Sequence, residues 1–276
     1  MSRGLHGPLD AAALRDGLSV RRVGRHILCL DETGSTNDDA FDLARLHGSA
    51  ADGWAVFAER QVRGRGRQGR RWLSPRGAGI HCSVLLCEKA ATLDESRLAL
   101  VGGVAAALAV RETTDAPPEV RWPNDLFIRG KKAGGVLVER RVSVGAVANA
   151  TVIGIGINCL QQRSHFDRTP DITQAATSLE IESSHAIDRT AVARALLRAL
   201  DGWLGSEPFD GAALTEQWRS LSGDAGRRVT LEVGGARYVG RMVEIDPDAR
   251  MTLEDDAGRR MSFDPRMASV VQRHET

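Results

Sequence analysis

The sequence predicts an α+β protein of two parts, a large domain of strands and helices followed by a small all-β domain. The chain has 276 residues, of which 42% are hydrophobic, so one large and one small domain can each bury a core. As far as Gly223, apolar strand segments are mixed with amphipathic helical segments. After Gly226, short alternating strands are joined by Gly and Asp-Pro turns, a pattern typical of a small β-barrel.

Overall charge and cysteine usage narrow the class of protein. Lys and Arg number 37 and Asp and Glu 36, and a formal net charge of +1 does not favour a nucleic-acid partner. The four cysteines form no CxxC pair and lie in apolar segments, which indicates buried, reduced thiols in a cytoplasmic protein. The sequence has no apolar run of the length that a signal peptide or a membrane span needs, so we expect neither secretion nor membrane insertion.

The N-terminal part begins with a short basic extension, residues 1–25, and a strand at 26–30. Ser35, Thr36 and Asn37 follow in a turn, directly before a helical pattern. All three residue types cap helices, and capping alone is one interpretation of this segment. The other interpretation is that these short polar groups, at the end of a strand, also face a ligand.

The most unusual segment is residues 59–79, called here the Arg/Gly loop, in which arginines alternate with glycines. Apolar segments at 54–60 and 80–88 are typical of strands, and we expect them to hold the base of the loop and to leave its tip free. Glycine lets the backbone approach a ligand closely, and guanidinium groups match carboxylate and phosphate oxygens. The composition therefore predicts a loop that closes over an anion.

A long apolar helix is predicted at 97–114, and a strand follows it at 119–128. Trp-Pro-Asn-Asp interrupts that strand, and since proline disfavours a central ladder position, Asn124 and Asp125 are expected at a bend with exposed side chains. The next segment is typical of a hairpin turn and a strand, with Lys132 at the start of the strand. A lysine in such a place is most often a solvated charge on a sheet edge.

A further buried strand is predicted at 150–159, where Gly154 and Gly156 fall on one face. The space above two missing side chains is filled either by a neighbouring side chain or by a flat ligand lying against the sheet. Two amphipathic helices complete the large domain, at 189–204 and 213–221.

The order of the motifs is more specific than any single motif. GSTN is followed by ExQxxGRGRQGRxW, RWPNDL, KKxGGVLVE, GIGIN and ATSL, and this series resembles the biotin protein ligases, or biotin–[acetyl-CoA-carboxylase] ligases. The resemblance implies a mixed-sheet α+β catalytic domain, similar to class II aminoacyl-tRNA synthetases and lipoate ligases, followed by a small SH3-like β-barrel. On this basis we expect the catalytic domain at 26–223 and the barrel at 224–276.

Members of that family join biotin to ATP, giving biotinyl-5′-AMP and pyrophosphate, and then transfer the biotinyl group to a lysine of a biotin carboxyl carrier protein. The resemblance implies ATP and biotin as substrates, Mg²⁺ as cofactor, and the carrier protein of acetyl-CoA carboxylase or a related acyl-CoA carboxylase as partner. Larger members carry an N-terminal DNA-binding domain. Because only the short extension 1–25 precedes the first strand, we expect the monofunctional class, with no DNA or membrane partner, and a homodimer stays open.

The resemblance also implies roles for the residues at the motif positions. The biotin-binding set is Ser35, Thr36, Asn37, Gln61, Gly64, Arg65, Gly66, Arg67, Lys132, Gly135, Gly154 and Gly156. The set that binds ATP or the adenylate is Arg65, Arg67, Trp72, Asn124, Asp125, Lys132 and Asn158. Lys132 and Arg67 are the expected catalytic residues, because cations offset the repulsion between a carboxylate and an α-phosphate. Asp125 is the expected Mg²⁺ ligand.

Departures from the family pattern and alternative functions accompany this assignment. His81 stands where an aromatic or aliphatic residue is common, and the chain ends in FDPRMASVV, where a Gly-Glu-Val-Ser type of ending is common. A lipoate or octanoate ligase of the same fold is the first alternative, and GRGRQGRxW together with KKxGGVLVE argues against it. A nucleic-acid-binding module is the second, and the near-neutral chain argues against it, as does a loop whose one aromatic residue is Trp72.

Overall fold

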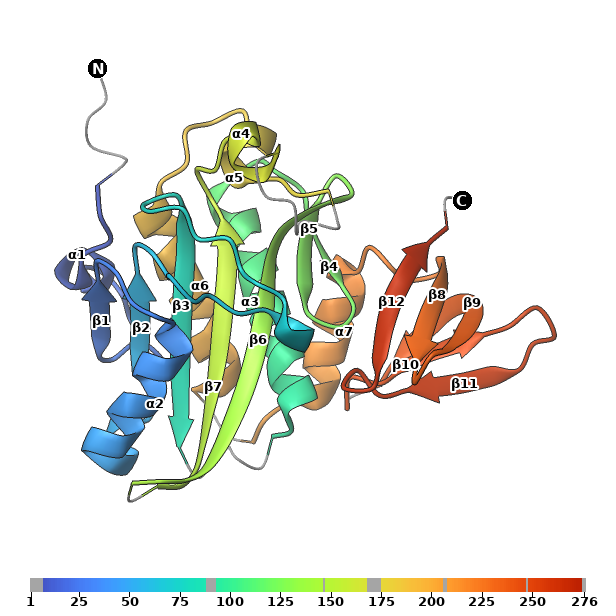
Figure 1. The fold of residues 1–276 in the computed structure, drawn as a ribbon, viewed down its shortest axis with the longest axis horizontal. Helices are drawn as coiled ribbons and strands as arrows, with labels where there is room; N and C mark the ends of the chain where they lie inside the picture. Colours follow the sequence, from blue (N-terminus) through green and yellow to red (C-terminus); the bar gives the residue numbers. More distant parts are fainter. Residues whose placement is uncertain are drawn as a thin grey trace.

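The structure is a computed structural model that describes residues 7–87, 93–145, 147–167, 175–205, 208–246 and 248–274. The start of the predicted N-terminal extension, Glu88 of the predicted strand 80–88, and residues 168–174, which follow the predicted strand at 150–159, lie outside the described residues. Figure 1 shows a large sheet with helices on both of its faces and a smaller sheet formed by the last five strands. In the described part of the chain, no helix is long and apolar enough to cross a membrane.

The large sheet has seven strands in the order β1-β2-β3-β7-β6-β5-β4. Its first two strands, β1 (Ile27–Leu30) and β2 (Ala55–Ala58), are parallel, and all other neighbours are antiparallel. The sheet is therefore mixed, as the resemblance implied. The other strands are β3 (Gly79–Cys87), β4 (Pro118–Arg121), β5 (Asp125–Ile128), β6 (Lys131–Val144) and β7 (Val147–Asn158).

Successive side chains of β7 point to opposite faces of this sheet, and each face packs against a different hydrophobic cluster. Ile153 and Ile155 belong to the main hydrophobic core, whereas Ala150 and Val152 pack in a second cluster with Phe41. The main core is covered by α3 (Glu95–Thr113), α6 (Arg189–Leu204) and α7 (Gly211–Leu221), and the second cluster is covered by α2 (Thr36–His47). Short helical segments are α1 (Ala11–Arg15), η1 (Gly48–Ala51), η2 (Arg67–Gly69), α4 (Arg163–Asp167) and α5 (Leu179–Glu182).

Local sequence signals explain the ends and the packing of the longer helices. Asp94 accepts hydrogen bonds from two backbone amides at the start of α3, and Asp188 does the same for α6. A side chain at Gly102 would lie 2.8 Å from a methyl group of Val136, so the glycine lets α3 lie close against β6. The helices predicted after Asn37 and at 97–114, 189–204 and 213–221 are confirmed, with ends shifted by no more than a few residues.

The second sheet is antiparallel, with the order β11-β10-β9-β8-β12. Trp122 joins it to the large sheet, because its indole donates to the carbonyl of Ala249 at 2.8 Å and its backbone amide donates to Asp224. Arg273 also pairs with Asp224, at 2.7 Å. The five strands are β8 (Arg228–Val233), β9 (Ala236–Ile245), β10 (Met251–Glu254), β11 (Arg260–Phe263) and β12 (Ala268–Arg273).

Three expectations about the middle of the chain are wrong. The segment predicted as one interrupted strand is an antiparallel hairpin of β4 and β5, in which Arg121 pairs with Asp125. Asn124 is 6% exposed instead of fully accessible, because the turn folds its side chain back onto β6, where it donates to the carbonyl of Val136. Lys132 is not on an edge, since β6 lies between β5 and β7.

Candidate functional site

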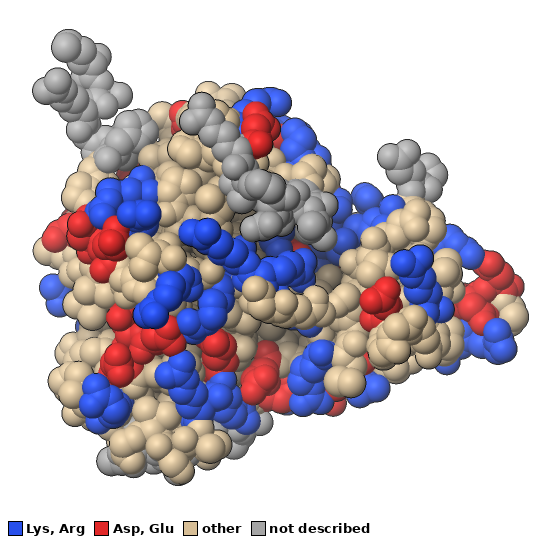
Figure 2. Space-filling model, viewed as in Figure 1, with Lys and Arg blue, Asp and Glu red and all other residues tan. Residues whose placement is uncertain are grey.

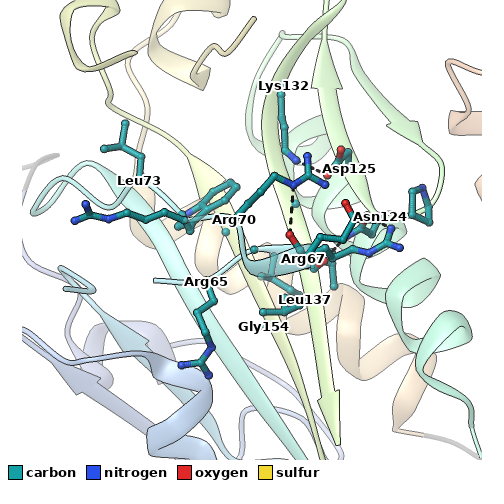
Figure 3. Close-up of a pocket in the computed structure, with 18 of the residues that line it drawn as sticks. Arg65, Arg67, Arg70, Leu73, Asn124, Asp125, Lys132, Leu137 and Gly154 are labelled. Atoms are coloured by element: carbon teal, nitrogen blue, oxygen red, sulfur yellow. Dashed lines mark hydrogen bonds and ion pairs between the residues drawn. The ribbon is translucent and has the colours of Figure 1, made fainter. Parts of the chain in front are cut away.

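A cavity of about 690 Å³ lies over the part of the large sheet that α2 leaves uncovered. The central strands of the sheet form the floor of the cavity. Their register places Ser83 on β3, Gly154 on β7 and Leu137 on β6 side by side. Gly156 and Gly135 form the neighbouring row on the same face. Gly135, Gly154 and Gly156 carry no side chain, so other groups can approach the sheet closely here, and the Arg/Gly loop lies over this region (Figure 3).

Neighbouring side chains fill part of the space above the paired glycines. A side chain at Gly154 would collide with the carboxamide of Asn37, and one at Gly156 would lie 2.5 Å from the ring of Trp72. Both glycines also line the cavity. Of the two interpretations of the glycine pair, packing of a neighbouring side chain is therefore confirmed.

The start of α2 contributes polar groups to one end of the cavity. Ser35 is at the N-cap position, but its side chain makes no capping hydrogen bond to the described residues. Thr36 donates from its amide and its hydroxyl to Oε1 of Gln61, at 2.9 and 3.1 Å. The hydroxyl of Ser83 donates to Oδ1 of Asn37 at 2.6 Å and lies 2.7 Å from the hydroxyl of Thr36. Capping alone is therefore the wrong interpretation of this segment. Its side chains form a buried, neutral hydrogen-bonding group.

A charged group beside this neutral end was not predicted from the sequence. The carboxylate of Glu139 accepts a hydrogen bond from the side-chain carboxamide of Asn37 at 2.6 Å and one from Arg65 at 3.1 Å. Arg65 also forms a bidentate ion pair with Asp38, at 2.8 and 3.1 Å. Arg65 and Arg141 hold the pKa of Asp38 below its ordinary value. The signal for Glu139 was present, because it closes the KKxGGVLVE motif four residues after Gly135 and so shares its face of the strand.

The Arg/Gly loop is held at its base and paired within itself. Glu59 and Arg189 form a buried ion pair at 2.8 Å below the loop. The amide of Trp72 donates to the carbonyl of Gly64 at 2.9 Å, and that of Gly66 donates to Arg70 at 2.7 Å. Gly64 was expected at the biotin site, but it supports this ladder and does not line the cavity.

The tip of the loop is docked against the second sheet, so the expectation of a free tip is wrong. Arg67 donates to the carbonyl of Pro265 at 2.5 Å, and Gln68 donates to the hydroxyl of Ser269 at 2.7 Å. These partners are 198 and 201 residues away in the sequence. Nothing local in the loop specifies such contacts, which depend on where the second sheet stands.

A cationic end of the cavity lies opposite the neutral one. Nζ of Lys132 is 2.6 Å from Oδ1 of Asp125, with side chains 24% and 18% exposed. Arg67 donates to Oδ1 of Asn124 at 3.3 Å, and Figure 3 shows these four side chains converging. Burial lowers the pKa of Arg67 and Asp125 opposes that effect, but a guanidinium stays charged throughout the ordinary pH range.

Trp72 and Asn158 complete the wall nearest to Gly156. The indole Nε1 of Trp72 is buried and has no hydrogen-bond partner among the described residues. Asn158 donates to the carbonyl of Thr177 at 2.9 Å and accepts from Gln161 at 3.2 Å, so its carboxamide is held in one orientation. An unpartnered buried donor at a cavity wall is typical of a ligand-binding site.

His81, the unusual residue of β3, supports the neutral end through Ser74. Its ring lies 2.6 Å from the hydroxyl of Ser74, which accepts from the amide of Gln61 at 3.1 Å. Burial, and to a lesser extent Arg189, lowers the pKa of His81 to about 3, so the ring is neutral at ordinary pH. His81 therefore helps to place Gln61 without adding charge to the site.

The cavity is rich in cations and poor in carboxylates. Asp125 is the one carboxylate among the described residues that line it, and the part of the chain that the structure covers has no cluster of three or more metal-binding side chains. Figure 2 shows Lys and Arg side chains gathered over the same face. This donor set fits Mg²⁺ that arrives with phosphate oxygens, since Mg²⁺ commonly takes one or two carboxylates together with phosphates and water. The cations that line the cavity are Arg65, Arg67, Arg70, Arg71, Lys132 and Arg273.

Comparison with known proteins identifies the class. The model of the Biotin/lipoate A/B protein ligase family matches residues 31–158. The chain is 34% identical over 261 residues to the biotin–[acetyl-CoA-carboxylase] ligase of Mycobacterium tuberculosis, covering 91% of each chain. It is 30% identical over 254 residues to the bifunctional ligase/repressor BirA of Bacillus subtilis, covering 91% of this chain and 76% of the relative.

A solved structure agrees with these relatives. The biotin protein ligase of Aquifex aeolicus in complex with biotin and ATP superposes with a TM-score of 0.74 at 26% identity, covering 91% of this chain and 100% of that one. The chain belongs to the biotin protein ligase family. The predicted mixed-sheet catalytic fold with a separate C-terminal sheet is confirmed with it.

Proposed function

We propose that the chain joins biotin to ATP in this cavity and then transfers the biotinyl group to a lysine of a carboxylase carrier protein. The observation that supports this most directly is the division of one cavity into two chemically different ends. Thr36, Asn37 and Gln61 offer neutral donors and acceptors suited to a ureido ring. Lys132 and Arg67 offer fixed positive charge where a carboxylate would meet an α-phosphate.

The cationic end accounts for the first step. The biotin carboxylate attacks the α-phosphorus, the bond to the β-phosphate oxygen breaks, and pyrophosphate leaves. Lys132 and Arg67 offset the repulsion between the two anions and the charge that develops on the phosphoryl oxygens. Asp125 fixes the ammonium of Lys132 through their 2.6 Å contact, and it would also hold Mg²⁺, which supplies charge neutralisation on the phosphates.

The second step needs a shielded intermediate more than it needs a reactive side chain. The amine of the acceptor lysine attacks the acyl carbon, AMP leaves, and the amine loses a proton. Water would hydrolyse the same bond, so the adenylate must stay covered until the carrier arrives. We assign this cover to the Arg/Gly loop, with Trp72 and Asn158 beside the nucleotide. Neither step forms a covalent intermediate with a side chain, so the chemistry requires none of the four cysteines.

The direct test is an exchange assay. With biotin and Mg·ATP, we expect the protein to exchange labelled pyrophosphate into ATP in a biotin-dependent manner. Lipoate and octanoate should support no exchange above background, because the neutral end of the cavity is built for hydrogen bonds that neither acid can make. If lipoate or octanoate supported exchange and biotin did not, the assignment to biotin would be refuted.

A second test concerns the floor of the cavity. In Gly154→Ala the added methyl group collides with the carboxamide of Asn37, and Asn37 must give up its bonds to Ser83 and Glu139. We expect the affinity for biotin, measured by calorimetry, to fall about tenfold, the usual effect of leaving a buried polar group unpaired.

Gly202→Ala is the matched control for that variant. A methyl group at this position of α6 meets no atom within 4 Å, and alanine favours a helix over glycine. Its affinity for biotin should equal that of the wild type. Unchanged affinity in Gly154→Ala would mean that Asn37 does not contribute to the biotin site.

A further inference from the structure

The contact between the Arg/Gly loop and the second sheet joins two parts of the molecule that the reaction needs at different times. Residues 64–72 form a hairpin with its own ladder, including a bridge between Arg65 and Arg71. Gln68 lies at the turn of this hairpin and adopts a left-handed backbone, with φ 56° and ψ 37°. Such a backbone is uncommon away from glycine and persists where surrounding contacts hold it. For Gln68 such a contact is the hydrogen bond from its side chain to the hydroxyl of Ser269.

The acceptor side of this contact is well fixed. Ser269 lies on β12, which pairs with β8 and stands at the edge of the second sheet. The turn before it is held by Asp264, whose carboxylate accepts from the amide of Arg266 at 2.8 Å and whose carbonyl accepts from that of Ala268 at 3.0 Å. Pro265 is within the same turn. The loop therefore meets a pre-ordered surface and not a second flexible segment.

The same contact sets the position of a catalytic side chain. The guanidinium of Arg67 lies between Asn124 in the β4–β5 turn, at 3.3 Å, and the carbonyl of Pro265, at 2.5 Å. Both acceptors are neutral, so they orient Arg67 without cancelling its charge. Gln68 is the next residue, and its side chain donates to the hydroxyl of Ser269 at 2.7 Å.

We propose that Gln68 and Ser269 form a latch through which the C-terminal sheet holds the Arg/Gly loop over the cavity. In this role both are positioning residues. They keep Arg67 in place and, on the proposed function, slow the escape of the acyl adenylate. Opening of the latch exposes the cavity to the carrier protein. The C-terminal sheet thus acts on catalysis through the loop and not only through its own residues at the cavity wall.

Limited proteolysis tests the latch without any substrate, because both partners belong to the chain. Trypsin cleaves after arginine, and cleavage after Arg70 or Arg71 reports how often the loop opens. We expect Gln68→Ala and Ser269→Ala each to be cleaved there about twofold to tenfold faster than the wild type, the range for one hydrogen bond. The double variant should be cleaved no faster than either single variant, since both remove the same bond.

Two controls separate the latch from a general loosening of the protein. Gln272→Ala removes an exposed glutamine from the same strand, and it should be cleaved at the wild-type rate. Ser269→Thr keeps the hydroxyl and should also restore wild-type cleavage. Equal rates in all variants, or additive effects in the double variant, would overturn the proposal.

A chase experiment then connects the latch to the reaction. Each single variant should release preformed labelled biotinyl adenylate faster than the wild type by the same factor as its cleavage rate. Release at the wild-type rate despite faster cleavage would overturn the role of the latch in retaining the adenylate. Failure of every protein, including the wild type, to form adenylate would refute the proposed function, and the cleavage rates would still decide whether the latch exists.

Discussion

Lys132→Ala is expected to slow biotin-dependent pyrophosphate exchange by roughly a hundredfold to a thousandfold, a typical effect of removing one preorganised group that stabilises transition-state charge. The ammonium of Lys132 lies 2.6 Å from Asp125, in a cavity where Asp125 is the one carboxylate among the described lining residues. Its loss removes positive charge and leaves the charge of Asp125 uncompensated near the incoming phosphates. Binding of biotin alone, measured by calorimetry, should persist because its ureido ring meets the neutral end of the cavity.

The neighbouring lysine supplies the control. Lys131 points away from the cavity and contacts Glu182 at 3.3 Å. Lys131→Ala removes the same charge from the same strand, and its exchange rate should match that of the wild type. If Lys132→Ala exchanged pyrophosphate at the wild-type rate, Lys132 would have no part in adenylate formation.

Arg67→Gly is expected to release the adenylate roughly tenfold to a hundredfold faster, the range for losing a hydrogen bond made by a charged group. The substitution removes the contacts to Asn124 and to the carbonyl of Pro265 together, and it frees the backbone at the tip of the loop. Escaped adenylate acylates exposed lysines, so proteins other than the carrier should become biotinylated. Blotting with labelled streptavidin after incubation with a mixture of unrelated proteins measures this effect.

Arg63→Gly is the matched control for this variant. Arg63 belongs to the same loop and does not line the cavity, so the variant reproduces the loss of charge and the gain of flexibility. We expect it to retain the adenylate as the wild type does. If Arg63→Gly and Arg67→Gly labelled unrelated proteins to the same extent, the effect would come from the charge or flexibility of the loop. The position of Arg67 would then not be the cause.

The elements of this fold are encoded locally, and sequence reasoning located them well. The helix that begins after Asp188 combines a capping carboxylate with an apolar stripe, and both signals lie within a few residues. The strands that hold the Arg/Gly loop were predicted from apolar runs on either side of it. Where the prediction failed, at the β4–β5 hairpin, the direction of the chain after Pro123 depended on a partner strand, β6, that lies further along the sequence.

The order of the motifs in the sequence by itself determined the family, and with it the cationic loop, Lys132 and the paired glycines of β7. Only the tertiary structure decided which groups these residues meet. Arg65 pairs with Asp38 and Glu139 because α2 and β6 are brought to the same face of the sheet, and Gln68 reaches Ser269 because the second sheet stands beside the loop. The physical reason is that residue type specifies what a side chain can bind, whereas packing of distant segments specifies which partner lies within hydrogen-bonding distance.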